Sequence, residues 1–158
     1  MEQRHIALIR LKGQGNLRPE IVATFKALRL FKKQYCTIIP NTPEYVGMLR
    51  VIKDCATWGE ISPDVFKQLL LKRGRLARKK SLTEVYVKEH AKMSIDDFVK
   101  SFFSFKSTLT VIPGLKLFFR LSPPRKGLEK KGVKADYSLG GALGYRKDQI
   151  NDLLMRMI

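Results

Sequence analysis

His5-Ile6-Ala7-Leu8-Ile9-Arg10-Leu11-Lys12 is the first of three apolar runs around which the amino-terminal part of the chain is arranged. Its odd-numbered apolar residues share one face, while the other face changes from Ile6 and Leu8 to Arg10 and Lys12. A period of two predicts a β-strand. We expect the far end of this strand to be exposed and basic.

Two helices and two more strands are predicted to follow this first strand. Leu17–Glu20 and Asn41–Glu44 each place a proline and then an acid where a helix would begin, positions that suit both residues. Tyr35–Ile39 is β-branched and aromatic and predicts a second strand, and Thr57–Ile61 predicts a third. Residues 5–61 therefore read β-α-β-α-β, and their spacing allows either parallel or antiparallel pairing.

Positive charge dominates the composition. The chain of 158 residues has 31 Lys and Arg against 14 Asp and Glu, which gives a net charge of +17 and a pI near 10.1. Residues 1–61 carry a net +5, whereas residues 62–158 carry +12. A field of this size attracts polyanions, and nucleic acid is the commonest partner of so basic a protein.

Two stretches concentrate this charge. Lys72–Lys80 holds six cations in nine positions, and Pro113–Lys134 holds seven cations against Glu129 alone. Pro123-Pro124 and Gly127 are expected to keep the second stretch out of regular structure. Such runs are either solvated linkers or surfaces that neutralise phosphates.

The second half also contains helix and strand patterns. Helices are predicted to start at Ser62-Pro63-Asp64, at the capping-box pattern Ser81–Glu84, at Ser94–Phe98, and at about Tyr145. Thr108–Ile112 favours a strand.

Aromatic and glycine-rich segments have a structural and a binding interpretation. Phe102-Phe103-Ser104-Phe105 could stack on bases, but its spacing fits a helical core and we favour the core. Gly140–Gly144 could hold a phosphate, but the glycine-turn interpretation is favoured because no strand precedes it and no Lys-Ser/Thr ending follows. Gly47 interrupts a predicted helix at a cost of about 1 kcal/mol, which indicates close packing or a close partner.

Several chemistries find no support in the sequence. Cys36 and Cys55 form no Cys-x-x-Cys pattern, and His5 and His90 are the only histidines, so neither a zinc site, a disulfide framework nor a catalytic triad is predicted. Asp96-Asp97 is explained by the start of a helix. No signal peptide and no apolar run of membrane-spanning length is present, which predicts a cytoplasmic protein.

A longer motif resembles a known family. Asn41-Thr42-Pro43-Glu44-Tyr45-Val46-Gly47-Met48-Leu49-Arg50, followed by Gly59-Glu60-Ile61, resembles the signature of the large-subunit ribosomal protein family called L-thirty in bacteria and L-seven in eukaryotes. Lys72-Arg73-Gly74, Leu121–Gly127 and Arg146–Asn151 are similar to the carboxy-terminal half of its long form. A basic arm before the first strand is missing, which favours the archaeal form, and Ser107–Leu117 departs from the family pattern.

The resemblance implies an α+β fold related to ferredoxin-like folds. We expect a three-stranded antiparallel sheet with two helices on one face in residues 1–61, and a basic, mostly helical extension in residues 62–158. It implies a structural constituent of the large ribosomal subunit, with no enzymatic activity, cofactor, metal or small-molecule substrate. The implied partners are large-subunit rRNA, 5S rRNA and neighbouring ribosomal proteins.

The candidate RNA-binding residues combine the basic stretches with the helix that carries Gly47. They are Arg10, Lys12, Gly47, Met48, Arg50, Lys53, Lys72, Arg73, Arg75, Arg78, Lys79, Lys80, Arg125, Lys126, Lys130, Lys131 and Arg146. The alternative function is an RNA-processing or RNA-modifying enzyme that holds its substrate on the basic surface. Such an enzyme needs a clustered acid, base or metal site, and the sequence offers none. A third function, binding to anionic membranes, is disfavoured because the run 72–80 has too few bulky apolar residues.

Overall fold

The fold is organised around a five-stranded mixed sheet. The computed structural model describes residues 4–158, apart from the side chain of Lys79. The strands lie in the order β4-β2-β1-β3-β5, with β1 (His5–Arg10) in the centre. Both neighbours, β2 (Tyr35–Pro40) and β3 (Ala56–Glu60), run antiparallel to β1. The predicted β-α-β-α-β core and the α+β class are confirmed.

The prediction of only three strands was incomplete. β4 (Phe119–Arg120) pairs antiparallel with β2, and β5 (Gly144–Tyr145) pairs parallel with β3. Both come from the second half of the chain. The carboxy-terminal extension therefore contributes the outermost strand at each edge of the sheet.

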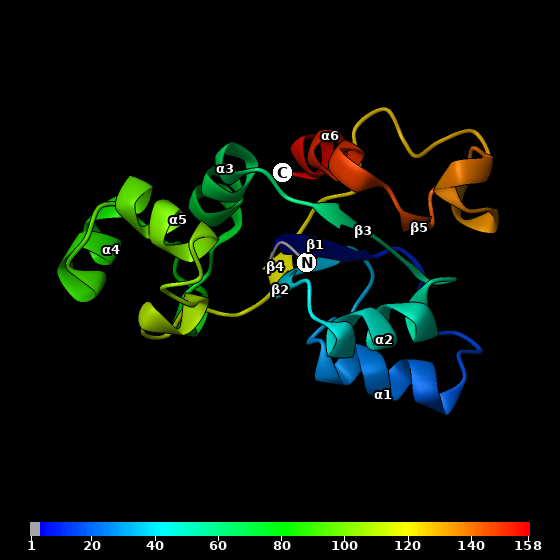
Figure 1. The fold of residues 1–158 in the computed structure, drawn as a ribbon, viewed down its shortest axis with the longest axis horizontal. Helices are drawn as coiled ribbons and strands as arrows, with labels where there is room; N and C mark the ends of the chain where they lie inside the picture. Colours follow the sequence, from blue (N-terminus) through cyan, green and yellow to red (C-terminus); the bar gives the residue numbers. More distant parts are fainter. Residues whose placement is uncertain (1–3) are drawn as a thin grey trace.

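Two helices cover one face of the sheet. α1 (Pro19–Ala27) and α2 (Pro43–Ile52) lie side by side below the strands in Figure 1. Ile6 and Leu8 of β1 face these helices and pack with Phe25 and Ile52, both almost fully buried. The arrangement agrees with the expectation of two helices on one face.

The extension covers the opposite face. Ala7 and Ile9 of β1 belong to a second core built largely from α3 (Pro63–Arg73), α5 (Ile95–Phe103) and α6 (Ile150–Met157). α4 (Glu84–Ala91) packs against α5, away from the sheet (Figure 1). Phe102, at the end of α5, is buried and stacks on His5 and Phe66, which confirms the core interpretation for this residue, whereas Phe105 is 36% exposed.

The expectation of an exposed, basic end to the first strand was wrong. All six residues of β1 are buried, because helices cover both faces of the sheet. Arg10 is 3% exposed, and its guanidinium donates hydrogen bonds to the carbonyl oxygens of Leu30 at 2.8 Å and Lys12 at 2.9 Å. Its Cζ also lies 4.3 Å from the centre of the Phe25 ring. Arg10 thus has a structural role in the interior of the fold.

Most predicted helix starts are confirmed. A proline occupies the first turn of α1, α2 and α3, and Ser94 caps α5 by accepting a hydrogen bond from the Asp97 amide at 3.1 Å. The capping box at Ser81 is wrong, because the Ser81 hydroxyl accepts from Arg75 and Thr83 caps α4 instead.

Two other segments differ from their predictions. Thr108–Ile112 forms a 3₁₀ turn, Leu109–Val111, because Leu109 and Ile112 recur at a spacing of three and both point into the core. The helix expected from about Tyr145 begins later, because Tyr145 belongs to β5 and a 3₁₀ turn, Lys147–Gln149, precedes α6. Further 3₁₀ turns are Ala77–Lys79, Gly132–Lys134 and Tyr137–Leu139.

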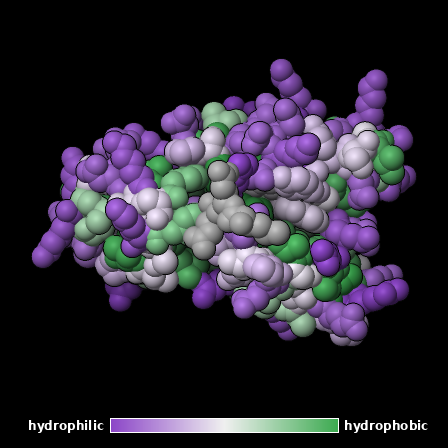
Figure 2. Space-filling view, in the orientation of Figure 1, coloured by the Kyte–Doolittle hydropathy of each residue, from purple (hydrophilic) through white to green (hydrophobic). Residues whose placement is uncertain are grey.

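The visible face is predominantly hydrophilic, with small apolar patches between the charged side chains (Figure 2). Among the described residues, no helix combines the length and the apolar character needed to cross a lipid bilayer.

Candidate nucleic-acid interface

The first basic stretch is a fixed loop at the end of α3. The Leu76 amide donates to the Lys80 carbonyl at 2.8 Å, and the Leu82 amide donates to the Gly74 carbonyl at 3.1 Å. Leu76 is buried in the core, whereas Lys72, Arg78 and Lys80 are exposed. The buried side chain of Leu76 therefore anchors the loop, and the side chains of these three cations lie at the surface.

Two arginines of this loop are partly engaged within the protein. The Arg73 guanidinium donates to the Ser122 hydroxyl at 2.5 Å and to the Ile158 carbonyl at 2.9 Å, which ties α3 to the end of the chain. Arg75 donates to the Ser81 hydroxyl at 2.5 Å and remains half-exposed. The side chain of Lys79, another predicted contact, lies outside the described residues.

Between β4 and the 3₁₀ turn Gly132–Lys134, the second basic stretch has no regular secondary structure, as its prolines predicted, and part of it runs along the end of α6. The Arg125 amide donates to the Arg156 carbonyl at 3.0 Å, and the Arg156 guanidinium donates to the Gly127 carbonyl at 3.0 Å. The predicted contacts Arg125, Lys126, Lys130 and Lys131 are all exposed. This segment is thus held at its backbone while its cations face solvent.

Backbone strain marks one cation in each basic stretch. Arg78 has φ 58° and Lys126 has φ 64°, both in the left-handed region. This conformation costs a residue with a side chain about 1–2 kcal/mol, and strain of this kind concentrates at functional sites. Six other residues with side chains, among them Arg29, Lys92 and Lys147, adopt the same conformation outside these stretches, so it does not single out the basic loops.

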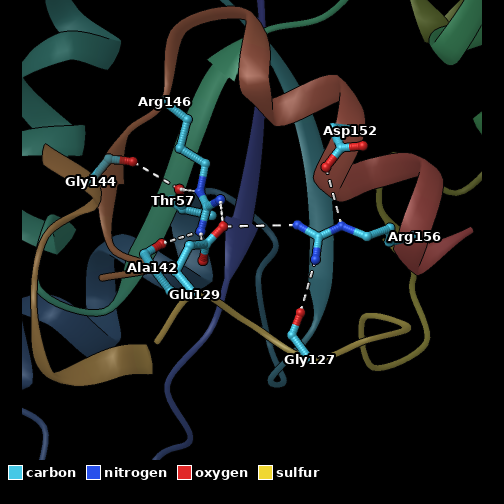
Figure 3. A network of polar contacts seen from close by, with 8 residues as sticks. All are labelled: Thr57, Gly127, Glu129, Ala142, Gly144, Arg146, Asp152 and Arg156. Carbon is cyan, nitrogen blue, oxygen red and sulfur yellow. Dashed lines mark hydrogen bonds and ion pairs between the residues drawn. The ribbon is translucent and has the colours of Figure 1, made fainter. Parts of the chain in front are cut away.

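Arg146, which was predicted to contact RNA, does not lie on the surface. It is 2% exposed, and its guanidinium hydrogen-bonds both carboxylate oxygens of Glu129, with Nη2 to Oε2 at 2.7 Å. It also donates to the Thr57 hydroxyl at 2.8 Å and the Ala142 carbonyl at 2.9 Å (Figure 3). These contacts join β3, the second basic stretch and the segment before β5. Arg146 is a structural crosslink in the interior.

Glu129 is the acid that this crosslink requires. Burial raises the pKa of its carboxyl, but the hydrogen bonds and positive charges of Arg146 and Arg156 outweigh burial and lower that pKa below its ordinary value. The single acid in Pro113–Lys134 therefore neutralises internal arginines and leaves the exposed lysines of its own segment uncompensated.

The helix α2 presents a further exposed face. Gly47, Met48, Arg50 and Lys53 are all exposed on it. A Cβ added at Gly47 would meet no atom within 4 Å among the described residues. Close packing within the chain therefore does not explain this glycine. Lys12, another predicted contact, is half-exposed after β1.

The exposed cations of the basic stretches have few acidic neighbours. Among the described side chains, the ion pairs use Lys67, Arg146 and Arg156 as their cations. Within that part of the chain no group of three His, Cys, Asp or Glu could hold a metal ion. Gly140–Gly144 forms a tight turn in which a Cβ at Gly141 would lie 1.9 Å from the Ala135 carbonyl oxygen, so packing accounts for that glycine.

One cluster of cations was not predicted from the sequence. Arg75, Lys116 and Arg120 line a hollow together with Phe118 at the β4 edge of the sheet. Lys116 and Arg120 were counted in the second basic stretch, but their aromatic neighbours Tyr35 and Phe118 lie more than eighty residues apart in the sequence. Only the pairing of β4 with β2 brings them together.

Comparison with known proteins agrees with the resemblance over almost the whole chain. The sequence pattern of the family described as ribosomal protein L30p/L7e matches residues 6–55. The large ribosomal subunit protein uL30 of Methanopyrus kandleri is 46% identical over 149 residues, which cover 94% of this chain and 100% of that protein.

Two further archaeal relatives have the same name. The Nanoarchaeum equitans protein is 45% identical over 152 residues, 96% of this chain and 97% of its own. The Methanococcus maripaludis protein is 43% identical over 152 residues, 96% and 98% of the two chains. Each of the three matches covers more than nine tenths of this chain. This chain therefore belongs to the ribosomal protein L30p/L7e family.

Proposed function

We propose that this protein is a structural constituent of the large ribosomal subunit and binds large-subunit rRNA there. The observation that carries the proposal is the 46% identity along 94% of the chain with a protein named for that subunit. The supporting feature of this chain itself is the net charge of +17, most of it in residues 62–158.

The proposed mechanism is electrostatic and shape complementarity. Phosphates offset the mutual repulsion of cations that the protein leaves without acids, and the release of counterions from RNA drives binding. Such contacts position a protein without reading sequence, while the folded sheet holds the two loops at fixed places. Arginine adds bidentate geometry and stacking, so Arg78 and Arg125 are the preferred fixed contacts.

The proposed RNA surface keeps most of the predicted residues. It comprises Lys12, Gly47, Met48, Arg50, Lys53, Lys72, Arg75, Arg78, Lys80, Arg125, Lys126, Lys130 and Lys131, with Arg73 at its margin. Gly47 supports a close approach at α2, because the space over it is open. Arg10 and Arg146 are excluded, since their guanidinium groups are bonded inside the fold.

The resemblance also supports finer proposals. We propose that residues 1–61 form the core, with its relation to ferredoxin-like folds, and that residues 62–158 pack both on this core and on RNA. Contacts with the 5S rRNA region and with neighbouring ribosomal proteins complete the proposed surroundings. The alternative of an RNA-modifying enzyme is set aside because the family is one of ribosomal proteins.

Sedimentation of cell extract tests this function. In a low-salt, magnesium-containing gradient we expect the protein to travel with the large subunits, and to be released as salt rises. A protein making six to ten phosphate contacts loses about 10³- to 10⁵-fold in affinity between 50 and 200 mM salt. Recovery only at the top of the low-salt gradient would refute the proposal.

A further inference from the structure

We propose that the β4 edge of the sheet holds one nucleotide of an RNA strand, with its phosphate among Arg75, Lys116 and Arg120 and its base on the neighbouring aromatic rings. This edge site, defined by these three cations with Tyr35 and Phe118, rests on the proposed RNA-binding function and gives it a particular ligand chemistry.

Three segments distant in sequence build the edge site. Arg120 of β4 lies opposite Tyr35 of β2 in the antiparallel register. The Lys116 amide donates to the Arg75 carbonyl at 2.9 Å, which brings the first basic loop to the same edge. Main-chain hydrogen bonds therefore fix the positions from which all three cations reach the hollow.

The aromatic part is a short stack that is open to solvent. The rings of Tyr35 and Phe118 lie 5.2 Å apart between centres and are inclined by 7°, and both residues are half-buried. Phe31 meets Phe118 edge-on at 5.8 Å and is 47% exposed. The accessible parts of Phe118 and of the two rings that contact it form an apolar surface on which a base could lie.

The cations surround these same rings. The Arg120 Cζ lies 5.7 Å from the Tyr35 centroid and 6.0 Å from that of Phe118, and the Lys116 Nζ lies 6.0 Å from the Phe118 centroid. A cation–π contact of this type is weak at an exposed site and leaves the charge in place. Three cations facing one hollow repel one another until an anion enters.

The volume of the hollow limits the size of the anion that it can hold. Arg75, Lys116, Phe118 and Arg120 enclose about 160 Å³, and no acid is among these residues. Sites for drug-sized molecules occupy about 300–1,000 Å³, so this one suits a phosphate group and not a whole nucleotide. The base must then lie outside the hollow, where the rings are.

An RNA strand fits this combination better than other polyanions. Single-stranded or looped RNA supplies a phosphate and an unstacked base within one nucleotide, and proteins bind such bases on aromatic faces beside basic grooves. An acidic peptide would supply charge without a planar base. Binding to polyglutamate, which has charge but no bases, distinguishes these two classes of ligand.

The experiment measures binding of the full chain to purified large-subunit rRNA over a series of salt concentrations. We expect K116Q/R120Q to reduce the slope of log K against log salt by about 0.7, the contribution of the one phosphate that the site neutralises. The matched control K88Q/K100Q removes the same charge from exposed positions on α4 and α5 and should change the slope by less than about 0.3.

A second pair of variants tests the contribution of the Phe118 ring to binding. F118L should weaken rRNA binding about tenfold, as expected for the loss of one stacked base, whereas F118Y keeps the aromatic face and should bind like the wild type. Thermal denaturation checks that both variants fold. Binding to polyglutamate should be the same in F118L and the wild type, because a charged chain without bases does not use the ring.

The outcomes distinguish the site from the function. If the wild type binds rRNA but K116Q/R120Q behaves like K88Q/K100Q, or F118L binds like F118Y, the edge site is refuted and the RNA-binding function stands. Equal loss of rRNA and polyglutamate binding in F118L also refutes the nucleotide site. If the wild type shows no preference for rRNA over polyglutamate, both proposals fail.

Discussion

Glu129→Gln removes the negative charge from the buried crosslink while it keeps the size of the side chain. The Arg146 side chain is 1% exposed and that of Glu129 is 22% exposed, so the arginine cannot recover its lost partner from water. The crosslink joins β3, β5 and the second basic stretch (Figure 3). We therefore expect the variant to lower the stability of the whole fold.

The expected magnitude follows from the contacts that remain. Removing one partner of a buried ion pair costs about 3–5 kcal/mol. Glutamine can still accept one hydrogen bond, and Arg146 keeps its bonds to Thr57 and Ala142, so we expect a loss of about 2–3 kcal/mol. For a chain of this length, such a loss lowers the Tm by about 5–10 °C.

Circular dichroism during thermal and urea unfolding measures this loss. The matched control is Asp152→Asn, because Asp152 pairs with Arg156 one helical turn away but is 70% exposed. A surface pair of that kind contributes only about 0.3–0.5 kcal/mol. A Glu129→Gln variant as stable as Asp152→Asn would refute the reasoning.

The dependence on pH provides a further check on the same pair. Because the folded protein lowers the pKa of Glu129, its carboxylate stabilises the fold above the unfolded value of about 4.5. That contribution is lost as the pH falls through the lower folded value. The stability difference between wild type and Glu129→Gln should thus shrink below about pH 4.5, and a difference that grows there would contradict the assignment.

Four other outcomes are expected. Burial lowers the pKa of His5, so the wild type should lose stability as the pH falls below about 6.5, and His5→Phe, which keeps the ring, should flatten that part of a pH series of urea titrations. Gly47→Ala should raise the unfolding free energy by up to about 1 kcal/mol yet weaken cosedimentation with large subunits, whereas unchanged cosedimentation would argue against close contact there. Gly59→Ala should destabilise the fold, because its Cβ would lie 2.0 Å from a main-chain oxygen of the turn before α6, and a melting temperature equal to that of the wild type would exclude this clash. Cys36 and Cys55 should react with a thiol reagent only after denaturation, since burial raises the pKa of both thiols, and rapid native labelling would disprove it.

The local patterns of the first sixty residues predicted their elements well. Alternation in β1 and the prolines that open α1 and α2 are signals within a few residues, and the structure confirms each. β4 and β5 were missed because each has two residues and exists only through pairing with a distant strand. Such strands have no period of their own to detect.

The sequence predicted the candidate site correctly only for basic residues that are also exposed in the structure. The exposed lysines of both basic stretches are of this kind. Arg10 and Arg146 were misplaced because a basic sequence gives no sign that an arginine is bonded to carbonyl oxygens or to an acid seventeen residues away. The hollow at the β4 edge was not predicted, for the related reason that the rings beside it, Tyr35 and Phe118, come from opposite halves of the chain.

The position of β4 and β5 at the two margins of the sheet has a consequence during synthesis. The amino-terminal strands leave the ribosome first, with unsatisfied amides and carbonyls along both rims and one apolar face uncovered. Bare rims of this kind recruit other chains and promote aggregation. In the folded protein the second half covers the open face and pairs with part of each rim, at Tyr35 and Cys36 of β2 and at Thr57 and Trp58 of β3. We therefore expect the first half to depend on the second for its solubility. A truncation that removes the second half should yield insoluble material instead of a small soluble domain.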